Sequence, residues 1–546
     1  MGNQKLIALF ADSFKQNWEL PVFTDFQGGT YTYGEVAQII RNIHSFFKEN
    51  GIAKGDKVAM FGRNSSNWGI SFVATVSYGA VAVPVLPDFN PDDVHHIINH
   101  SEAKMLFGND LLLEKIEFSK IPQVQSVLSL VDFRLLYSVN DQMKENAEKC
   151  FKTDFPGKVN PQNFELTELG NEELCVISYT SGTSGYTKGV MIPVRSILSN
   201  LIYAREHMPL KPSDRIVSFL PMAHVFGLLF EFLFPVTVGC HITFLTKAPT
   251  PQVITQAFGE VSPNLILSVP LVIEKIYKKR ILPTLEKPVM KVLLAIPGIS
   301  ALLKSKVKAK LTETFGGKFF EIVIGGAPLS KDVETFFRSI KFPFTIGYGM
   351  TECGPLISYD GWKSFRSSSA GKLVDRMEVK IDSEDPYNVV GEILVKGENV
   401  MLGYYKNEEA TRATIDAEGW LHTGDLGVID KDNYIYIRGR SKNMLLGSSG
   451  QNIYPEELED KLSNQPYVAE CVVIDREGKL IALVFPDKES VQANSLTNEQ
   501  LETAMNENRL RVNKELPRYE HISRIELVEE EFEKTPKKNI KRYLYT

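Results

Sequence analysis

The sequence predicts an α/β fold: a large N-terminal domain of two doubly wound α/β subdomains and a small β-rich subdomain, then a small α+β C-terminal domain. Short apolar segments alternate with helical segments over residues 31–110 and again over 213–345, which is typical of a mostly parallel sheet covered on both faces. From about residue 370 to 440 the helices thin out, and from about 443 strands and helices mix again. The length of 546 residues requires about two to four structural units.

The elements follow in chain order. In the first subdomain we expect helices over Tyr33 to Glu49 and Trp68 to Tyr78, and strands at Lys57–Phe61 and Ala80–Val85. In the second we expect strands at Ile216–Phe219, Ile242–Leu245, Leu265–Ser268, Glu321–Ile324 and Phe344–Ile346. The β-rich unit has Glu378–Ile381, Glu392–Lys396, Leu426–Ile429 and Tyr434–Ile437. The C-terminal domain has strands Val468–Ile474, Leu480–Phe485 and Arg524–Leu527 and helices Glu456–Leu462 and Leu501–Lys514.

Composition excludes several classes of protein. Hydrophobic residues make up 43% and charged residues 23%, as in soluble globular proteins, and the net charge of −6 argues against a nucleic-acid partner. The five cysteines are scattered without C-x-x-C spacing, which suits a reducing compartment and gives no metal framework. The most apolar stretch, about Ile216 to Leu245, contains His224, Glu231 and two prolines, so we expect buried core rather than a membrane span. We therefore expect a cytoplasmic protein.

The segment Tyr179–Val190 has the composition of a phosphate-binding loop. Glycines let backbone N–H groups approach an anion, and Lys188 adds a positive charge. The glycines are Gly182, Gly185 and Gly189, and the short hydroxyl donors are Thr180, Ser181, Thr183, Ser184 and Thr187. A Walker A loop would lead into a helix, whereas strand-like residues flank this segment on both sides. We therefore expect a strand–loop–strand hairpin over phosphates; the alternative is a flexible surface turn.

This loop resembles the signature of the adenylate-forming (AMP-binding) superfamily, which includes acyl-CoA synthetases, peptide-synthetase adenylation domains and luciferases. Further motifs follow in the family's order along nearly the whole chain, which resembles the long-chain fatty acyl-CoA synthetases most. The resemblance implies ATP, Mg²⁺ and CoA as ligands, with Thr183 and Lys188 among the catalytic residues.

The segment Ile346–Glu352 matches the family's Y-G-x-T-E motif and follows a predicted strand, where open α/β sheets bind ligands. Thr351 can donate to a phosphate oxygen, and Glu352 offers the oxygen ligand that Mg²⁺ prefers. By resemblance Glu352 is the magnesium ligand and also catalytic, while Tyr348 and Gly349 lie along the adenine. The alternative is a surface turn with a solvated glutamate.

Two more motifs concern the nucleotide. Gly325, Gly326 and Ala327 follow a strand and resemble the family's adenine shelf. Asp425 follows a predicted tight turn, and a carboxylate can accept two hydrogen bonds from a ribose diol. The resemblance places ribose contacts at Asp425 and Arg440 and includes Ile437 in the nucleotide site; the alternative for Arg440 is an exposed ion pair.

The segment Phe219–Gly227 is where we expect the acyl substrate. His224 matches a family histidine beside the substrate carboxylate; the alternative is a core histidine. Peptide-synthetase domains carry an aspartate shortly afterwards to hold an α-amine, but Val225–Leu229 is apolar. An apolar pocket without a carboxylate fits a fatty acid better than an amino acid.

The C-terminal motifs imply a domain that moves. The resemblance makes Lys442–Asn443 a hinge, so we predict domains at 1–441 (α/β subdomains to about 370, β-rich unit about 371–441) and at 444–546, the second mobile. The segment that begins at Gly450 resembles the family's loop that lines the pantetheine tunnel. The family's C-terminal catalytic lysine is replaced by Asn539, and Lys538 or Lys537 could substitute for it after a shift. Without a substitute the first half-reaction should be slower by on the order of 10²–10³.

The predicted reaction is activation of a fatty acid to acyl-AMP with pyrophosphate release, followed by transfer to CoA. Three alternatives stay open: transfer to an acyl carrier protein, a different acid (aryl or short-chain), and a weakly catalytic nucleotide- and fatty-acid-binding protein, to which Asn539 points. The basic stretch from Lys278 to Lys310 leaves a peripheral membrane contact open beside a solvated helical face. Monomer and homodimer are equally compatible with the sequence.

Overall fold

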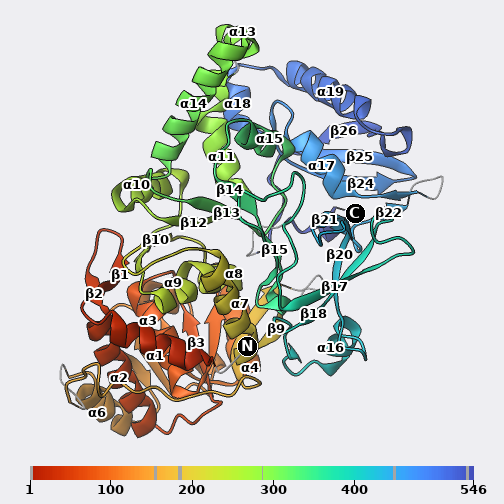
Figure 1. Ribbon diagram of the computed structural model, residues 1–546. Helices are drawn as coiled ribbons and strands as arrows, with labels where there is room; N and C mark the ends of the chain where they lie inside the picture. Colours follow the sequence, from red (N-terminus) through yellow and green to blue (C-terminus); the bar gives the residue numbers. More distant parts are fainter. Residues whose placement is uncertain are drawn as a thin grey trace.

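Figure 1 shows a computed structural model of the chain, in which residues 4–152, 157–181, 187–285, 287–446, 451–535 and 540–545 are described. One α/β unit lies at the bottom of the view and a second lies above it. The β-rich unit and the C-terminal domain lie beside them on the right. The predicted fold class, α/β with a large N-terminal and a smaller C-terminal domain, is confirmed.

The first unit is built on an eight-stranded sheet. In order across the sheet its strands are β19 (Gly403–Tyr404), β9 (Thr187–Pro193), β8 (Leu174–Ser181), β4 (Val81–Val85), β3 (Lys57–Phe61), β5 (Ala103–Gly108), β6 (Ser126–Ser129) and β7 (Leu135–Ser138). Strands β8, β4, β3, β5 and β6 are parallel, and the others pair antiparallel. Val58 and Met60 belong to the core on one face, and Ala59 and Phe61 to the core on the other. Burial on both faces explains the near-continuous apolar strands.

Helices cover this sheet. They are α1 (Leu6–Gln16), α2 (Tyr33–Glu49), α3 (Ser66–Tyr78), α4 (Pro91–Ser101), α5 (Asp110–Leu113), η1 (Phe118–Lys120), α6 (Asp141–Cys150) and α7 (Val194–His207). α2 has the predicted bounds, because a capping box starts it: the Thr32 side chain accepts from the Glu35 N–H, and the Glu35 carboxylate accepts from the Thr32 N–H.

The second unit contains two sheets. One has the order β10 (Arg215–Ser218), β11 (His241–Phe244), β1 (Pro21–Asp25) and β2 (Thr30–Thr32), and the other β12 (Leu265–Ser268), β13 (Glu321–Ile324) and β14 (Phe344–Ile346). All neighbours are parallel except β1 and β2. The helical segments are α8 (Val225–Gly227), the π-helix η2 (Leu228–Leu233), α9 (Phe234–Val238), α10 (Pro251–Val261), α11 (Pro270–Arg280), α12 (Leu282–Leu285), α13 (Pro288–Ala295), α14 (Pro297–Thr314) and α15 (Lys331–Ser339).

The apolar stretch around η2 is core, as predicted. Phe230, Phe232 and Phe234 are at most 1% exposed and belong to the main hydrophobic cluster. Within the described part of the chain, no helix combines the length and the apolar composition needed to cross a bilayer.

The β-rich unit is an antiparallel sheet of β17 (Met377–Asp382), β18 (Gly391–Gly397), β20 (Leu421–Ile429) and β21 (Ile435–Arg440), preceded by the pair β15 (Tyr348–Gly349) and β16 (Leu356–Ser358) and carrying α16 (Glu408–Thr414). The strand expected at Leu426–Ile429 begins earlier, at Leu421, so Asp425 lies inside β20. The turn at Asp416–Trp420 comes earlier, and Gly424 continues the strand with φ +70°.

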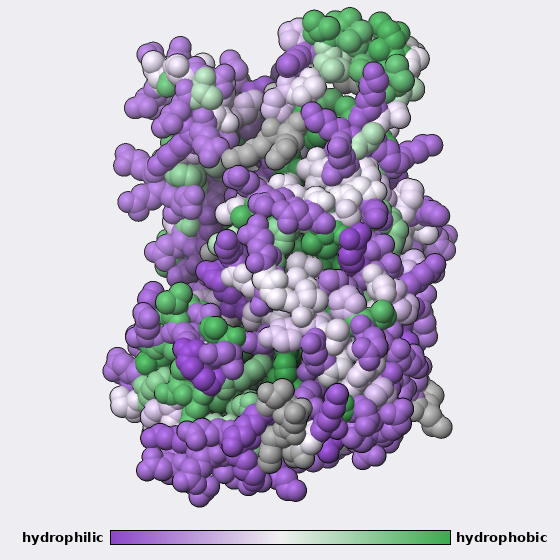
Figure 2. All heavy atoms as spheres, turned by 90° about the vertical axis from the view of Figure 1, so that its left-hand side faces the viewer, coloured by the Kyte–Doolittle hydropathy of each residue, from purple (hydrophilic) through white to green (hydrophobic). Residues whose placement is uncertain are grey.

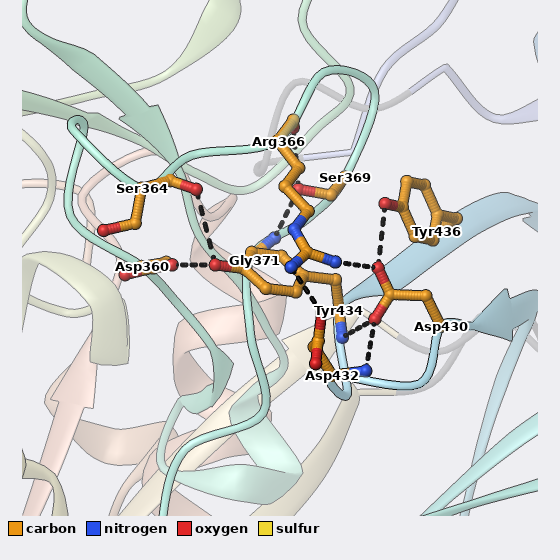
Figure 3. Close-up of polar contacts among 9 residues, drawn as sticks. All are labelled: Asp360, Ser364, Arg366, Ser369, Gly371, Asp430, Asp432, Tyr434 and Tyr436. Carbon is orange, nitrogen blue, oxygen red and sulfur yellow. Dashed lines mark hydrogen bonds and ion pairs between the residues drawn. The ribbon is translucent and has the colours of Figure 1, made fainter.

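Arg366 ties the turn between β20 and β21 to the long loop after β16 (Figure 3). Its guanidinium donates 2.5 Å hydrogen bonds to Asp430 and to Asp432 and lies 4.0 Å from the centroid of the Tyr434 ring. The Tyr434 hydroxyl donates to Asp360, and the Tyr436 hydroxyl donates to Asp430 over 3.2 Å. Burial alone would raise the pKa of Asp430, but backbone donors and Arg366 outweigh it and hold the pKa below its usual value.

The C-terminal domain has cores of its own. It comprises β22 (Leu445–Leu446), β23 (Asn452–Ile453), α17 (Pro455–Ser463), β24 (Val468–Arg476), β25 (Lys479–Pro486), α18 (Lys488–Ala493), α19 (Asn498–Lys514), η4 (Arg518–Glu520), β26 (Arg524–Leu527) and η5 (Arg542–Leu544). Alternate residues of β24 and β25 face two separate hydrophobic clusters. Polar contacts join the domain to the second α/β unit: Lys278 Nζ donates to Ser463 O over 3.3 Å, and Ser330 Oγ donates to Asn464 Oδ1 over 2.5 Å.

Candidate active site

The predicted phosphate-binding loop joins β8 and β9. Thr180 lies opposite Lys188 and Ser181 opposite Thr187 in an antiparallel ladder, which confirms the strand–loop–strand prediction. The predicted residues Gly182, Thr183, Ser184 and Gly185 lie outside the described residues.

One tyrosine links Lys188 to Glu352. Lys188 Nζ lies 4.7 Å from the centroid of the Tyr404 ring, and the Tyr404 hydroxyl donates a 2.9 Å hydrogen bond to Glu352 Oε1. Tyr404 reaches this place because β19 pairs with β9, where Tyr404 lies opposite Val190. The aromatic face attracts the ammonium group, and the hydroxyl orients the carboxylate. Burial, reinforced by the charge of Glu352, raises the pKa of Tyr404, so the hydroxyl keeps its proton at neutral pH.

A tight turn after β14 carries Glu352. Thr351 and Glu352 are half-buried and begin the 3₁₀ turn η3 (Thr351–Cys353). Gly349 has to be glycine, because a side chain there would overlap the Pro355 carbonyl oxygen. Met401 N donates over 2.8 Å to the Glu352 carbonyl, which fixes the turn against the residues that lead into β19.

A second cluster surrounds Asp425. Tyr348 donates a 2.7 Å hydrogen bond to Asp425 Oδ2, and Arg440 Nε lies 2.9 Å from Asp425 Oδ1. Asp425 and Arg440 are direct partners in the β20–β21 ladder. Asp425 is 3% exposed, and its burial raises the pKa of its carboxyl; Arg440 and Tyr348 oppose this, whereas the charges of Glu456 and Glu352 add to it. Tyr348, which binds Asp425, and Glu352, which binds Tyr404, lie four residues apart in the Ile346–Glu352 segment, so both clusters are built on the same stretch of chain.

The Gly325–Ala327 segment adjoins both clusters. Gly347 N donates over 2.9 Å to Ile324 O, which sets this segment beside the turn that carries Tyr348 and Glu352. Gly325 is buried and a side chain there would lie 3.2 Å from the Phe226 ring, while Gly326 and Ala327 are exposed. Two of the three predicted shelf residues are therefore accessible. Ile437 lies half-buried in β21, three residues before Arg440.

His224 is half-buried and precedes α8 as its N-cap. Two buried residues that the sequence analysis did not assign to the site hold the segment that carries it. Asn64 Nδ2 donates over 2.7 Å to Leu220 O, and Asn64 Oδ1 accepts over 3.0 Å from Met222 N. Glu231 Oε2 accepts from the backbone N–H groups of residues 219 and 220, over 3.0 and 2.9 Å. The one acid of this apolar stretch therefore binds backbone, and its burial raises its pKa.

A cavity of about 220 Å³ lies beside the hairpin, with Lys188 and Lys406 in its wall. Its lining residues are His100, Thr187, Lys188, Gly189, Tyr404, Tyr405, Lys406 and Asn407. Lys406 Nζ lies 3.0 Å from Glu102 Oε1, and this ion pair offsets part of the positive charge of the wall.

The predicted hinge, Lys442–Asn443, lies in the turn after β21, where Asn443 Nδ2 donates over 2.6 Å to Glu456 Oε1 of α17. Gly450, Lys537, Lys538 and Asn539 lie outside the described residues. Among the described residues, no group of three or more His, Cys, Asp or Glu side chains is placed to hold a metal ion. A single carboxylate such as Glu352 nevertheless fits Mg²⁺, which keeps several waters and is commonly bound through substrate phosphates.

The architecture is that of the adenylate-forming ligases. A solved anthranilate CoA ligase, AuaEII, in complex with anthranoyl-AMP, superposes with a TM-score of 0.81 at 20% identity, covering 99% of this chain and 96% of that one. The chain belongs to the AMP-binding enzyme family. The family model for AMP-binding enzymes matches residues 10–405, and the family model for their C-terminal domain matches residues 442–545.

Curated relatives are similar over most of the chain. It is 28% identical to the long-chain-fatty-acid–CoA ligase FadD15 of Mycobacterium bovis, over 84% of this chain and 78% of that protein. It is 26% identical to 4-coumarate–CoA ligase 3 of Arabidopsis thaliana, over 83% of this chain and 76% of that protein.

Proposed function

We propose that this protein is an ATP-dependent acid–CoA ligase that activates a long-chain fatty acid to acyl-AMP and then forms acyl-CoA. The observation that carries the proposal is the chain of contacts from Lys188 through Tyr404 to Glu352, beside buried Asp425. These contacts support the proposal because an adenylating site needs a cation for phosphate, a carboxylate for a metal ion and a carboxylate for a ribose diol.

In the first step the fatty carboxylate attacks the α-phosphorus of ATP and pyrophosphate leaves. Lys188 and the hairpin loop, including Thr180 and Ser181, hold the phosphates, and Thr351 donates to a phosphate oxygen. Glu352 is the ligand for Mg²⁺, which when bound neutralises phosphate charge. Tyr348, Gly349, Ile437 and the Gly325–Ala327 segment contact the adenosine, while Asp425 and Arg440 bind the ribose. Positioning and charge neutralisation carry such a step, and Lys538 is our candidate for the missing lysine at Asn539.

In the second step the C-terminal domain rotates about Lys442–Asn443, and the CoA thiolate attacks the acyl carbon while AMP leaves. Gly450 lets the backbone approach the pantetheine arm. The hydrogen bonds of Lys278 and Ser330 to the C-terminal domain are polar contacts of the kind that domains exchange when they move.

The apolar acyl site supports a fatty acid as the substrate. The segment after His224 is Val225–Phe230, and the carboxylate of Glu231 binds backbone N–H groups at 3.0 and 2.9 Å. Because Glu231 is 0% exposed, we do not assign its carboxyl group to a substrate amine. The similar proteins include both a long-chain-fatty-acid ligase and a 4-coumarate ligase, so a panel of acids is the deciding test.

The experiment is pyrophosphate release and thioester formation with ATP, Mg²⁺ and acids from acetate to palmitate, for the wild type and Asn539→Lys. Each acid is tested with CoA, with an acyl carrier protein and with neither acceptor. Release that depends on a long acid, with a CoA thioester as product, supports the proposal. Thioester formation only on a carrier protein assigns the acyl-AMP ligase alternative. A wild type that binds ATP but turns over no acid, beside an active Asn539→Lys variant, assigns the weakly catalytic one.

A further inference from the structure

The helices α13 and α14 form a protrusion at the top of the molecule, away from the active site (Figure 1). Figure 2 shows a contiguous apolar patch at this tip, edged by hydrophilic residues. The patch is made by Val289, Val292, Ile296, Ile299 and Leu302, which are 70%, 65%, 44%, 38% and 59% exposed. Single exposed apolar residues are normal on a protein surface, whereas five together at one tip mark an interaction site.

Lysines follow the apolar residues down the same face of α14. Lys306 and Lys310 are exposed and lie one and two turns beyond Leu302, at the spacing that puts residues on one helix face. At about 1.5 Å per residue, Lys306 lies roughly 6 Å behind Leu302 along the helix and Lys310 roughly 12 Å behind it. The tip is thus apolar at its end, and it becomes cationic one helical turn after Leu302.

The charge of this region is opposite to that of the rest of the chain. Residues 275–312 hold ten lysines and arginines and one glutamate, although the whole chain has a net charge of −6. Six of these ten lie at residues 287–310, in α14, in α13 or directly before it, and no acidic residue lies among them. A long basic side chain can extend its ammonium group to an anionic surface while apolar neighbours insert.

We propose that the α13–α14 tip docks onto the surface of an anionic phospholipid bilayer. The apolar residues enter the boundary between headgroups and acyl chains, and Lys306 and Lys310 contact lipid phosphates. Insertion is shallow, since no helix of the described residues is able to span a bilayer. The inference does not depend on the identity of the acid, because it concerns a surface outside the active site.

Charge complementarity decides between a bilayer and a second copy of the chain. A symmetric contact between two tips would bring the lysines of both copies together, and like charges repel. Anionic lipid instead neutralises Lys306 and Lys310 while the apolar tip leaves water.

The test is co-flotation of the full chain with vesicles of phosphatidylcholine and phosphatidylglycerol, compared with vesicles of phosphatidylcholine alone. We expect binding to the anionic vesicles that weakens with added salt. The double variant Val289→Asp and Val292→Asp should lower the partition coefficient about tenfold or more, and Lys306→Gln with Lys310→Gln should lower it and flatten the salt dependence.

Leu111→Asp with Val131→Asp is the matched control, because these residues are 71% and 58% exposed on the first α/β unit. It should bind vesicles like the wild type. Circular dichroism and the denaturation midpoint of each variant show whether it is folded. No flotation of the wild type with anionic vesicles, or equal binding by the folded Asp variant, would overturn the proposal. A dimer that the Asp variant dissociates, without vesicle binding, would assign the tip to self-association instead.

Discussion

Tyr404→Phe tests the link between Lys188 and Glu352 with one atom. The substitution keeps the ring 4.7 Å from Lys188 Nζ and removes the 2.9 Å hydrogen bond to Glu352 Oε1. A hydrogen bond to a charged group contributes about 1.5–3 kcal/mol, and the half-buried position of Glu352 favours the lower end. At 1.36 kcal/mol per factor of ten, kcat/KM for ATP should fall about tenfold.

The assay is steady-state pyrophosphate release at several Mg²⁺ concentrations. Because the hydroxyl orients the proposed metal ligand, the Mg²⁺ concentration for half-maximal rate should rise in Tyr404→Phe. In a Glu352→Gln background the same substitution should cost little more, since its partner is already altered. Tyr436→Phe is the matched control, as it removes a 3.2 Å hydrogen bond to Asp430 in the Arg366 cluster of Figure 3. Unchanged activity and Mg²⁺ dependence in Tyr404→Phe, or equal losses in both backgrounds, would refute the reasoning.

Three further predictions concern the frame of the site. Gly349→Ala should lower the free energy of unfolding by about 2 kcal/mol and abolish most turnover, because a side chain at residue 349 overlaps the Pro355 carbonyl oxygen. The control Gly259→Ala, in α10, should raise stability by about 0.5–1 kcal/mol. Denaturation curves and turnover rates check both variants. Burial raises the pKa of Glu321 to about 7, so the folded carboxyl keeps a proton that the unfolded chain releases, and wild-type stability should fall as pH rises from about 5 to 8. In Glu321→Gln the decrease in the free energy of unfolding between about pH 5 and pH 8 should be smaller by about 2–3 kcal/mol than in the wild type. Urea titrations that give the same pH profile for both proteins would contradict the raised pKa of Glu321. Asn64→Ala removes the side-chain partner of two backbone groups, so it should lower the free energy of unfolding by about 2–3 kcal/mol and raise KM for the acid. An unchanged KM would show that Asn64 does not support the acyl site.

Local signals were sufficient for much of the fold. α2 was predictable from its apolar spacing, and the capping box of Thr32 and Glu35 explains why it starts where it does. The strands Leu265–Ser268 and Glu321–Ile324 match the prediction because each is a short, fully buried run. Arg524–Leu527 also matches, although it is at most half-buried and pairs with β25. β1 was missed, since Pro21–Asp25 is short and gains its place only by pairing with β11, far along the chain.

In the site, too, local motifs predict some residues, whereas others depend on contacts between distant parts of the chain. Tyr348, Asp425 and Arg440 could be named from motifs, and the structure brings them together. Tyr404 could not, because nothing near Gly403–Tyr404 indicates that it pairs with β9 and reaches Glu352. Asn64 likewise acts through a turn more than a hundred residues away. Glu231 did give a signal, as a lone acid in an apolar run, but its backbone partners are a tertiary feature.

Acid-dependent exchange of labelled pyrophosphate into ATP, measured without CoA, tests the central claim most directly because it isolates formation of the acyl-adenylate. We predict exchange that requires Mg²⁺ and a long-chain acid, that is faster in Asn539→Lys, and that is strongly reduced in Lys188→Ala and Glu352→Gln. If ATP binds but no acid supports exchange in either the wild type or Asn539→Lys, the proposed activation of a fatty acid at this site is wrong.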